Sequence, residues 1–392
     1  MILWLIWPVA AVLLFLSVWI VLPPPNFFWL PLAVGAPEVS PWLGFVGAIA
    51  LFLSILAYRS SPSLSSRSLI TALLISLFLS SLPLLQSPIA IAKANQSMTA
   101  AFGESSIAAN SRAASFAPFN GLNFVRGFST QDVRHIDRVQ FAAPDGQPLF
   151  LQVYQPAAAG TYPAVVMLYG GGWSHGDSSE NEAFGRFLAA RGYVVVALEY
   201  RLTPEYRFPT QLADVKSGLA FVRQRAAEYE IDPERLALVG WSAGAQLAML
   251  TGFQGELGVK SLVDFYGPVD LAAGYANPPV PDPLDVQQVL LAFLGGPPSE
   301  LPAAYAEASP ITYVKSANPN ALPPTLLVYG GKDKIVEAKY GKFLYEQLLK
   351  SGNTAVWVRI PWAEHAFDKV FNGVSNQMAL HFVERFLVQT LF

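Results

Sequence analysis

The sequence predicts an α/β protein, in which a mostly parallel sheet carries helices on both faces and follows an all-helical N-terminal segment. Two observations support this fold class. From about residue 139 onward, short β-branched and aromatic runs alternate with longer stretches of helical periodicity, which is typical of a parallel sheet with crossover helices. Before that point the chain is strongly apolar, and no Lys or Arg precedes Arg59.

The N-terminal quarter has the composition of a membrane segment. The whole chain is 53% hydrophobic and only 14% charged, which is too apolar for an ordinary soluble protein. Three apolar runs, at about 2–22, 42–58 and 69–92, each approach the ~20 residues that a helix needs to cross hydrocarbon. We expect residues 1–94 to form three transmembrane helices in contact with membrane lipid. The Ser-, Ala- and Asn-rich stretch over 95–134 then predicts a linker.

The charges that flank these runs predict a topology. The loop between the second and third runs contains Arg59 and Arg67, whereas the first loop holds Glu38 as its only charged residue. The positive charge places the Arg loop in the cytoplasm, so that a multi-pass protein has its C-terminal domain on the extracytoplasmic side. A cleaved signal peptide is the alternative for the first run, but residues 1–3 carry no Lys or Arg and no small-residue cleavage site follows closely.

Charge and cysteine content exclude several classes of protein. A net charge of −3 and a pI near 5.9 give no large basic field, so no nucleic-acid partner is expected. With no cysteine, the chain can form no disulfide, no thiolate nucleophile and no cysteine-based metal site. We expect neither a metal nor an organic cofactor.

The globular domain is expected over 135–392. A proline-rich stretch at about 270–311, with one short helical run at 286–293, predicts a small insertion that is a candidate lid. The clearest helices are predicted at 180–190, 209–230, 336–351 and 372–390. The strands are predicted at 139–142, 149–154, 164–168, 193–198, 236–239, 261–265, 325–329 and 355–360.

A candidate nucleophile follows the 236–239 strand. There the chain reads Gly-Trp-Ser-Ala-Gly over 240–244 and then becomes helical. This is the arrangement of a nucleophile elbow, in which Ser242 occupies a strained turn and larger residues two positions away would clash. The alternative is a pair of glycines that packs a helix against a strand. The position between a predicted strand and a predicted helix favours the elbow.

A serine hydroxyl needs a neighbouring base, and the chain offers four histidines. We predict His365, which follows the 355–360 strand in a loop at the carboxyl edge of the sheet. His135 precedes the first strand, His175 lies in a glycine loop, and His381 falls inside the last helix, where a packed or solvated imidazole is the expected role.

Asp333, just past the 325–329 strand, is the predicted acid that orients the imidazole. Glu364 and Asp368 are the alternatives, but a carboxylate so close in sequence to His365 would reach the far ring nitrogen with difficulty. The resulting chain order of Ser, Asp and His is one of the known orders of such triads.

Negative charge that develops on a substrate carbonyl oxygen needs backbone donors. The glycines at 170–172 follow the third strand, and they let main-chain N–H groups approach without interference from a Cβ. The amide after Ser242 is a second source of donors. A flexible surface hairpin is the alternative for this loop. The spacing of the glycines in the loop fits neither of the common phosphate-binding glycine motifs.

Taken together, these segments resemble the hormone-sensitive-lipase-like and feruloyl-esterase-like branch of carboxylesterases with the α/β-hydrolase fold, over roughly 139–392. The matching motifs are YGGGWSHGD at 169–177, EYRLTPEYRFP at 199–209, DPERLALVGWSAGAQLA at 232–248, GGKD at 330–333 and EHAF at 364–367. The resemblance implies an eight-stranded sheet and a triad of Ser242, Asp333 and His365. It also implies oxyanion donors from Gly171, Gly172 and Ala243.

The chain departs from the family pattern near the site. Tyr169 stands where histidine is usual, and Trp241 fills the variable position before the serine. These two residues and Trp173 are candidates for the walls of the substrate pocket. The N-terminal helices are not part of the general family pattern.

The resemblance implies hydrolysis of a small-molecule ester, lipophilic esters included, through an acyl-enzyme on Ser242. An amidase or peptidase that uses the same triad is one alternative, and a catalytically silent binding protein is another. A further hypothesis concerns the lid, whose Leu290, Leu291 and Phe293 would dip into the membrane and open the pocket. The alternative is that these residues pack on the sheet.

Overall fold

The computed structural model describes residues 2–109, 116–130, 132–255 and 258–392, and an eight-stranded sheet lies at its centre. The strand order is β1-β2-β4-β3-β5-β6-β7-β8. Strand β2 runs antiparallel to β1 and β4, and the other neighbours are parallel. The predicted fold class is thereby confirmed. The strands are β1 (Arg134–Ala142), β2 (Leu149–Gln155), β3 (Tyr162–Leu168), β4 (Val194–Leu198), β5 (Ile231–Trp241), β6 (Ser261–Phe265), β7 (Thr325–Gly330) and β8 (Ala355–Ile360).

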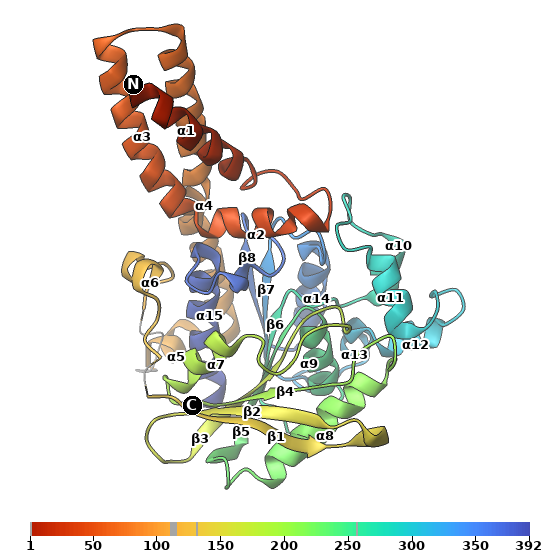
Figure 1. Cartoon of the computed structure of the whole chain (residues 1–392). Helices are drawn as coiled ribbons and strands as arrows, with labels where there is room; N and C mark the ends of the chain where they lie inside the picture. Colours follow the sequence, from red (N-terminus) through yellow and green to blue (C-terminus); the bar gives the residue numbers. More distant parts are fainter. Residues whose placement is uncertain (1, 110–115, 131, 256–257) are drawn as a thin grey trace.

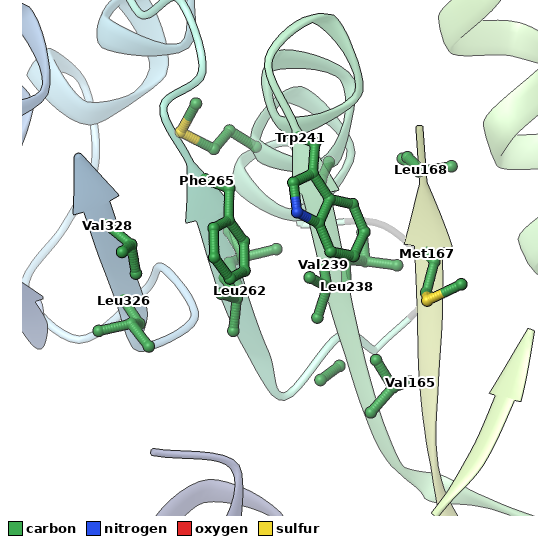
Figure 2. Packing of buried hydrophobic residues seen from close by; sticks show 14 of the residues in the cluster. Val165, Met167, Leu168, Leu238, Val239, Trp241, Leu262, Phe265, Leu326 and Val328 are labelled. Atoms are coloured by element: carbon green, nitrogen blue, oxygen red, sulfur yellow. The ribbon is translucent and has the colours of Figure 1, made fainter. Parts of the chain in front are cut away.

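The central strands are apolar on both faces. Val165 on β3 pairs with Ala237 on β5, and Val239 on β5 pairs with Val263 on β6. Figure 2 shows how the apolar side chains of β3, β5, β6 and β7 lie next to one another in the core. Continuous apolar runs of this kind are expected where helices cover both faces of a parallel sheet.

The covering helices lie close to their predicted positions. α7 (Glu182–Ala189) and α15 (Val374–Leu391) pack on one face, and α8 (Thr210–Gln224), α9 (Ala243–Phe253) and α14 (Ala338–Lys350) lie on the other (Figure 1). Along α8, a stripe of buried residues at a spacing of three or four faces inward, as the helical period requires. It consists of Leu212, Val215, Leu219 and Val222.

The insertion between β6 and β7 is larger than predicted. It forms four short helices, α10 (Leu271–Ala276), α11 (Val286–Leu294), α12 (Pro302–Glu307) and α13 (Pro310–Lys315). Only α11 was visible in the sequence. The other three have six residues each, and fewer than two turns carry no periodic signal.

The N-terminal segment forms a bundle that projects from the sheet domain (Figure 1). The bundle consists of α1 (Ile2–Val18), α3 (Ser40–Ser60) and α4 (Leu64–Phe102), while α2 (Leu30–Glu38) lies across its base. By length and composition, α3 and α4 could cross a membrane, and α1 contributes a shorter apolar helix. α4 begins with a capping box at Ser63 and Ser66 and continues past its internal prolines, Pro83 and Pro88.

The linker predicted over 95–134 is wrong in its first part, because α4 continues to Phe102. Ala90, Ala94 and Met98 are buried in the same apolar core as the sheet. Their spacing of four residues places them on one helix face, and small side chains let that face approach the sheet domain closely. Of these residues, Met98 falls in the stretch that was predicted as a linker, and Ala90 and Ala94 fall in the predicted membrane segment.

The continuation of α4 also covers the edge of the sheet. The N–H of Trp357 on the edge strand β8 donates to Ser97 Oγ at 2.8 Å, so a backbone donor at an exposed edge finds a partner. Two short helices follow, α5 (Glu104–Ala109) and α6 (Gly121–Arg126), whereas 110–115 and 131 lie outside the described residues. The bundle is thus joined to the sheet domain by a continuous helix that packs on β8.

Candidate active site

Ser242 stands in a strained turn between β5 and α9. Its backbone has φ 51° and ψ −119°, a conformation that L-residues rarely adopt outside functional sites. A Cβ on Gly244 would overlap the carbonyl oxygen of Leu168, and a Cβ on Gly240 would overlap the carbonyl oxygen of Gly244. The Gly-x-Ser-x-Gly spacing therefore follows from the close approach of β3, β5 and α9.

The structure brings the three predicted triad residues together at the carboxyl edge of the sheet. Ser242 follows β5, Asp333 follows β7 and His365 follows β8. His365 Nε2 lies 3.0 Å from Ser242 Oγ, and His365 Nδ1 lies 2.7 Å from Asp333 Oδ2. Both distances are those of hydrogen bonds. The imidazole thus links the hydroxyl to the carboxylate in the arrangement that a general base requires.

Asp333 is held in place by its own loop. Its side chain is buried, and its Oδ1 accepts from the backbone N–H groups of Ile335 and Val336, each at 2.8 Å. These bonds leave Oδ2 directed at His365. Burial by itself would lower the pKa of His365, but the hydrogen-bonded Asp333 carboxylate and the nearby acids raise it above its ordinary value.

Glu364 joins the two loops that carry Asp333 and His365. Its Oε1 accepts from the backbone N–H of Lys334 at 2.6 Å and from that of His365 at 3.1 Å. It is fully buried, and burial raises its pKa to about 7. Glu364 therefore braces the loops and does not take the place of Asp333 beside the ring nitrogen.

The other candidate groups are engaged elsewhere. Asp368 accepts from the hydroxyl of Tyr266 and from Asn181 Nδ2. The three remaining histidines hydrogen-bond away from the triad, His135 with Gln152, His175 with Ser174 and His381 with the carbonyl oxygen of Phe116. Within the described ranges, no cluster of three or more His, Asp and Glu side chains is placed to hold a metal ion.

The glycine loop packs directly on the nucleophile elbow. A Cβ on Gly170 would lie 3.2 Å from the Cβ of Ser242. Gly172 and Ala243 both border the pocket beside Ser242, and Ala243 is the first residue of α9, where a backbone N–H has no partner within the helix. The carbonyl of Gly171 accepts from the N–H groups of Ser174 and His175, which closes the loop.

An apolar pocket opens beside Ser242. The glycine loop, the start of α9, the insertion helices α10 and α11, and α14 all contribute to it. Such a cavity suits an apolar group held next to a reacting carbonyl. Its apolar walls include Trp173, Leu271, Leu284, Val286, Val289, Leu290, Ile335 and Val336.

Of the three predicted pocket residues, only Trp173 is among those that line this pocket. Tyr169 and Trp241 point into the core, which corrects the prediction. Tyr169 stacks on Tyr200 with ring centroids 4.4 Å apart, and each hydroxyl donates to the other residue's carbonyl oxygen. Trp241 stacks on Phe265 at 5.2 Å, as Figure 2 shows. Both side chains therefore pack in the core beneath the glycine loop and the nucleophile elbow, and neither lines the pocket.

The residues of the candidate lid lie at different depths, and Leu291 is half-buried. Leu290 and Phe293 are buried, and Phe293 stacks on Trp173 with ring centroids 4.0 Å apart. Both side chains therefore pack inward, Phe293 on the glycine loop and Leu290 at the pocket, and opening of the lid at a membrane stays a prediction. The sequence signal for an inward face is a set of apolar residues at the spacing of one helix face, namely Val286, Val289, Leu290 and Phe293.

Two residues at the site escaped the sequence analysis. Gln246 accepts from Trp173 Nε1 at 3.1 Å and donates to the carbonyl oxygen of Ala308 at 2.7 Å, so it fixes the indole that lines the pocket. A polar residue inside the otherwise apolar α9 was the signal for it. Tyr340 of α14 lines the pocket wall, and no motif in the sequence marks it.

Comparison with known proteins finds esterases as relatives. A family model described as BD-FAE matches residues 151–348. The probable carboxylic ester hydrolase LipM of Mycobacterium tuberculosis is 29% identical over 245 residues, which cover 59% of this chain and 55% of LipM. The esterase LipC of the same organism is 27% identical over 274 residues, which cover 65% of this chain and 66% of LipC. The chain thus spans between half and two thirds of the length of these curated relatives.

Solved structures give the same fold. The thermostable carboxylesterase EstE1, cloned from a metagenomic library, superposes with a TM-score of 0.56 at 27% identity, over 69% of this chain and 93% of EstE1. A bacterial heroin esterase superposes with a TM-score of 0.58 at 24% identity, over 69% of this chain and 88% of that chain.

Removal of the nucleophile tests the triad. Ser242→Ala should lower the turnover of an activated ester by roughly 10⁴-fold or more, and His365→Ala by a similar factor, because the two groups act on the same step. The double variant should be little worse than either single variant in steady-state assays. Losses that multiply would mean that Ser242 and His365 act independently.

The pH dependence tests the electrostatics of His365. The neutral imidazole is the active base, so activity should rise with pH through the raised pKa of His365, and the acidic limb of kcat/KM should lie above pH 6.5. Glu364→Gln keeps an oxygen acceptor for the two amides but removes a negative charge. Because Glu364, with a pKa of about 7, is only partly ionised over this limb, we expect a small shift of the limb to lower pH. A shift to higher pH would contradict the raising effect of Glu364 on the pKa of His365.

Proposed function

The chain belongs to the BD-FAE family, and from that premise we propose that it is a membrane-anchored serine carboxylesterase that works through an acyl-enzyme on Ser242. The observation that carries this proposal is the placement of His365, which hydrogen-bonds Ser242 on one ring nitrogen and Asp333 on the other.

The first half-reaction forms the acyl-enzyme. His365 takes the proton of Ser242 as the hydroxyl attacks the ester carbonyl, and Asp333 holds the ring and stabilises the imidazolium that results. Backbone N–H groups of Gly172 and Ala243, with Gly171 as a further candidate, bind the developing oxyanion. His365 then gives the proton to the departing alcohol.

The second half-reaction releases the acid. A water molecule takes the position of the alcohol, and His365 removes a proton from it as it attacks the acyl carbonyl. The same donors stabilise the second tetrahedral intermediate, and Ser242 regains its proton. Catalysis of this kind uses only groups of the chain.

The pocket supports an apolar substrate group. Val289 and Leu290 of α11 face Ile335 and Val336, which follow the triad acid, across the space beside Ser242. Contact with these side chains removes apolar substrate surface from water, which stabilises the bound ester by about 25 cal/mol per Å². We expect esters with an apolar acyl or alcohol group to react better than strongly polar ones.

The packing of the bundle supports a membrane location. Inside the bundle, Ser17 Oγ lies 2.8 Å from Ser76 Oγ and 3.0 Å from Ser80 Oγ, and all three side chains are buried. On the outside of α3, Phe45 and Phe52 are 60% and 61% exposed. Large apolar side chains on the outer surface of the bundle, together with hydrogen-bonded serines between its helices, suit a bundle surrounded by lipid.

Relative rates on matched substrates test the reaction. We expect the detergent-solubilised protein to hydrolyse p-nitrophenyl esters and to react with a fluorophosphonate probe at Ser242. The corresponding p-nitroanilides should react far more slowly. Faster turnover of the anilides would indicate an amidase, and absence of both turnover and labelling would indicate a silent binding protein.

Reporter fusions test the topology. With three crossings and the Arg59 to Arg67 loop in the cytoplasm, a reporter that is active only outside the cytoplasm should work when fused after Phe392. The same reporter should fail when it is placed in the loop between α3 and α4. The opposite pattern of activities would overturn this orientation, although it would leave the esterase proposal intact.

A further inference from the structure

The loop that carries the triad acid is bonded to the end of α1. Lys332, the residue before Asp333, donates from its Nζ to the carbonyl oxygens of Ile20 at 2.7 Å and Trp19 at 3.2 Å, with that of Leu22 at 3.5 Å. These carbonyls follow the last turn of α1, where backbone acceptors have no partners within the helix. An ammonium group at the carboxyl end of a helix is also favoured by the helix dipole.

Burial of the Lys332 ammonium group costs free energy, and the hydrogen bonds to these carbonyl oxygens must offset that cost. Burial lowers the pKa of Lys332 to about 8, while the nearby Glu364 carboxylate opposes the shift. The ammonium has therefore exchanged much of its hydration for the carbonyls of a segment more than 300 residues earlier, since the two bonded positions are 312 residues apart. A turn lysine that served solubility alone would remain in water.

A displacement of Lys332 would be transmitted to both loops that carry Asp333 and His365. The N–H of Lys332 donates to the carbonyl oxygen of Ala363 at 2.9 Å, and the N–H of Gly331 donates to that of Ile360 at 2.7 Å. Through these bonds the loop after β7 is joined to the loop after β8, which carries His365. The contact with α1 thus acts on a unit that contains both the acid and the base.

A second contact connects α2 with the loop that carries His365. Glu38, the last residue of α2, is fully buried at the start of α15, where it accepts from the N–H of Ser375 at 2.8 Å and bonds the hydroxyl of the same residue. Ser375 Oγ in turn accepts from Trp362 Nε1 at 2.9 Å. Trp362 lies three residues before His365, so α2 is connected to the base loop through two side chains.

Resting on the esterase function proposed above, we propose that Lys332 and Glu38 are positioning residues, through which α1 and α2 hold the Asp333 and His365 loops in register. The N-terminal segment is then a component of the catalytic apparatus as well as an anchor. Small displacements matter here, because misplacement of a catalytic group by about 1 Å can cost on the order of 100-fold in rate.

The first test replaces Lys332 in the full-length, detergent-solubilised protein. Lys332→Met keeps an unbranched side chain that is one atom shorter and removes the ammonium donors. We expect kcat for a p-nitrophenyl ester to fall by roughly 10- to 100-fold, with KM within about twofold because the pocket walls are untouched. Lys332→Arg, which retains donors and charge, should recover most of the lost rate.

The control is Lys339→Met on α14, which makes the same charge change at an exposed site. Active-site titration with the fluorophosphonate probe sets the concentration of competent enzyme, so kcat per titrated site does not depend on how much protein is folded. If Lys332→Met loses thermal stability but keeps the kcat of the wild type per titrated site, Lys332 is structural and the inference is wrong.

The second test uses Glu38. Glu38→Gln keeps one oxygen acceptor for the Ser375 N–H, and its amide nitrogen can donate to Ser375 Oγ in place of the second acceptor, so it should retain most of the activity of the wild type. Glu38→Ala removes both contacts and should lower kcat per titrated site several-fold. Equal activity of the two variants would refute a role for Glu38. A wild-type enzyme that hydrolyses no ester would refute the proposed function itself, and the inference with it.

Discussion

The hydrogen bond between His365 Nδ1 and Asp333 Oδ2, at 2.7 Å, is the contact on which the rest of the structure converges. It requires that β7 and β8 end at the same level, and the register that pairs Gly330 with Ile360 provides this. A Cβ on Gly331 would lie within 3 Å of the backbone of Pro361, so the two loops can cross only at a glycine. With His365 fixed in this way, the strained turn at Ser242 places the serine hydroxyl beside the imidazole.

The fold and the triad could be predicted from the sequence because their signals are local. Glycines two positions before and after Ser242, and a titratable residue in the loop that follows each of two strands, are patterns that short segments contain. Side-chain direction was harder to predict. Tyr169 and Trp241 adjoin the site in sequence, yet both turn into the core, since an aromatic ring at the end of a buried strand gains more from packing than from lining an opening.

Long-range contacts were outside the reach of sequence analysis. Ser97 and Trp357, which bond across the sheet edge, are 260 residues apart, and Ser97 lies in a stretch that has the composition of a linker. No sequence pattern marks the role of Lys332 either. Its partners are backbone carbonyls at the end of an apolar helix, and no side-chain pattern marks a backbone acceptor. The N-terminal helices therefore contribute more to the catalytic domain than their composition predicts.

The central claim is that Ser242 carries the acyl group during ester hydrolysis. The most direct measurement is to mix the full-length protein with an excess of a p-nitrophenyl ester, quench in acid within the first turnover, digest, and locate the acyl group by mass spectrometry. The account predicts an acyl group, at most one per chain, on the peptide that contains Ser242, and none in Ser242→Ala. Turnover without an adduct on that peptide, or an adduct on another residue, would contradict it.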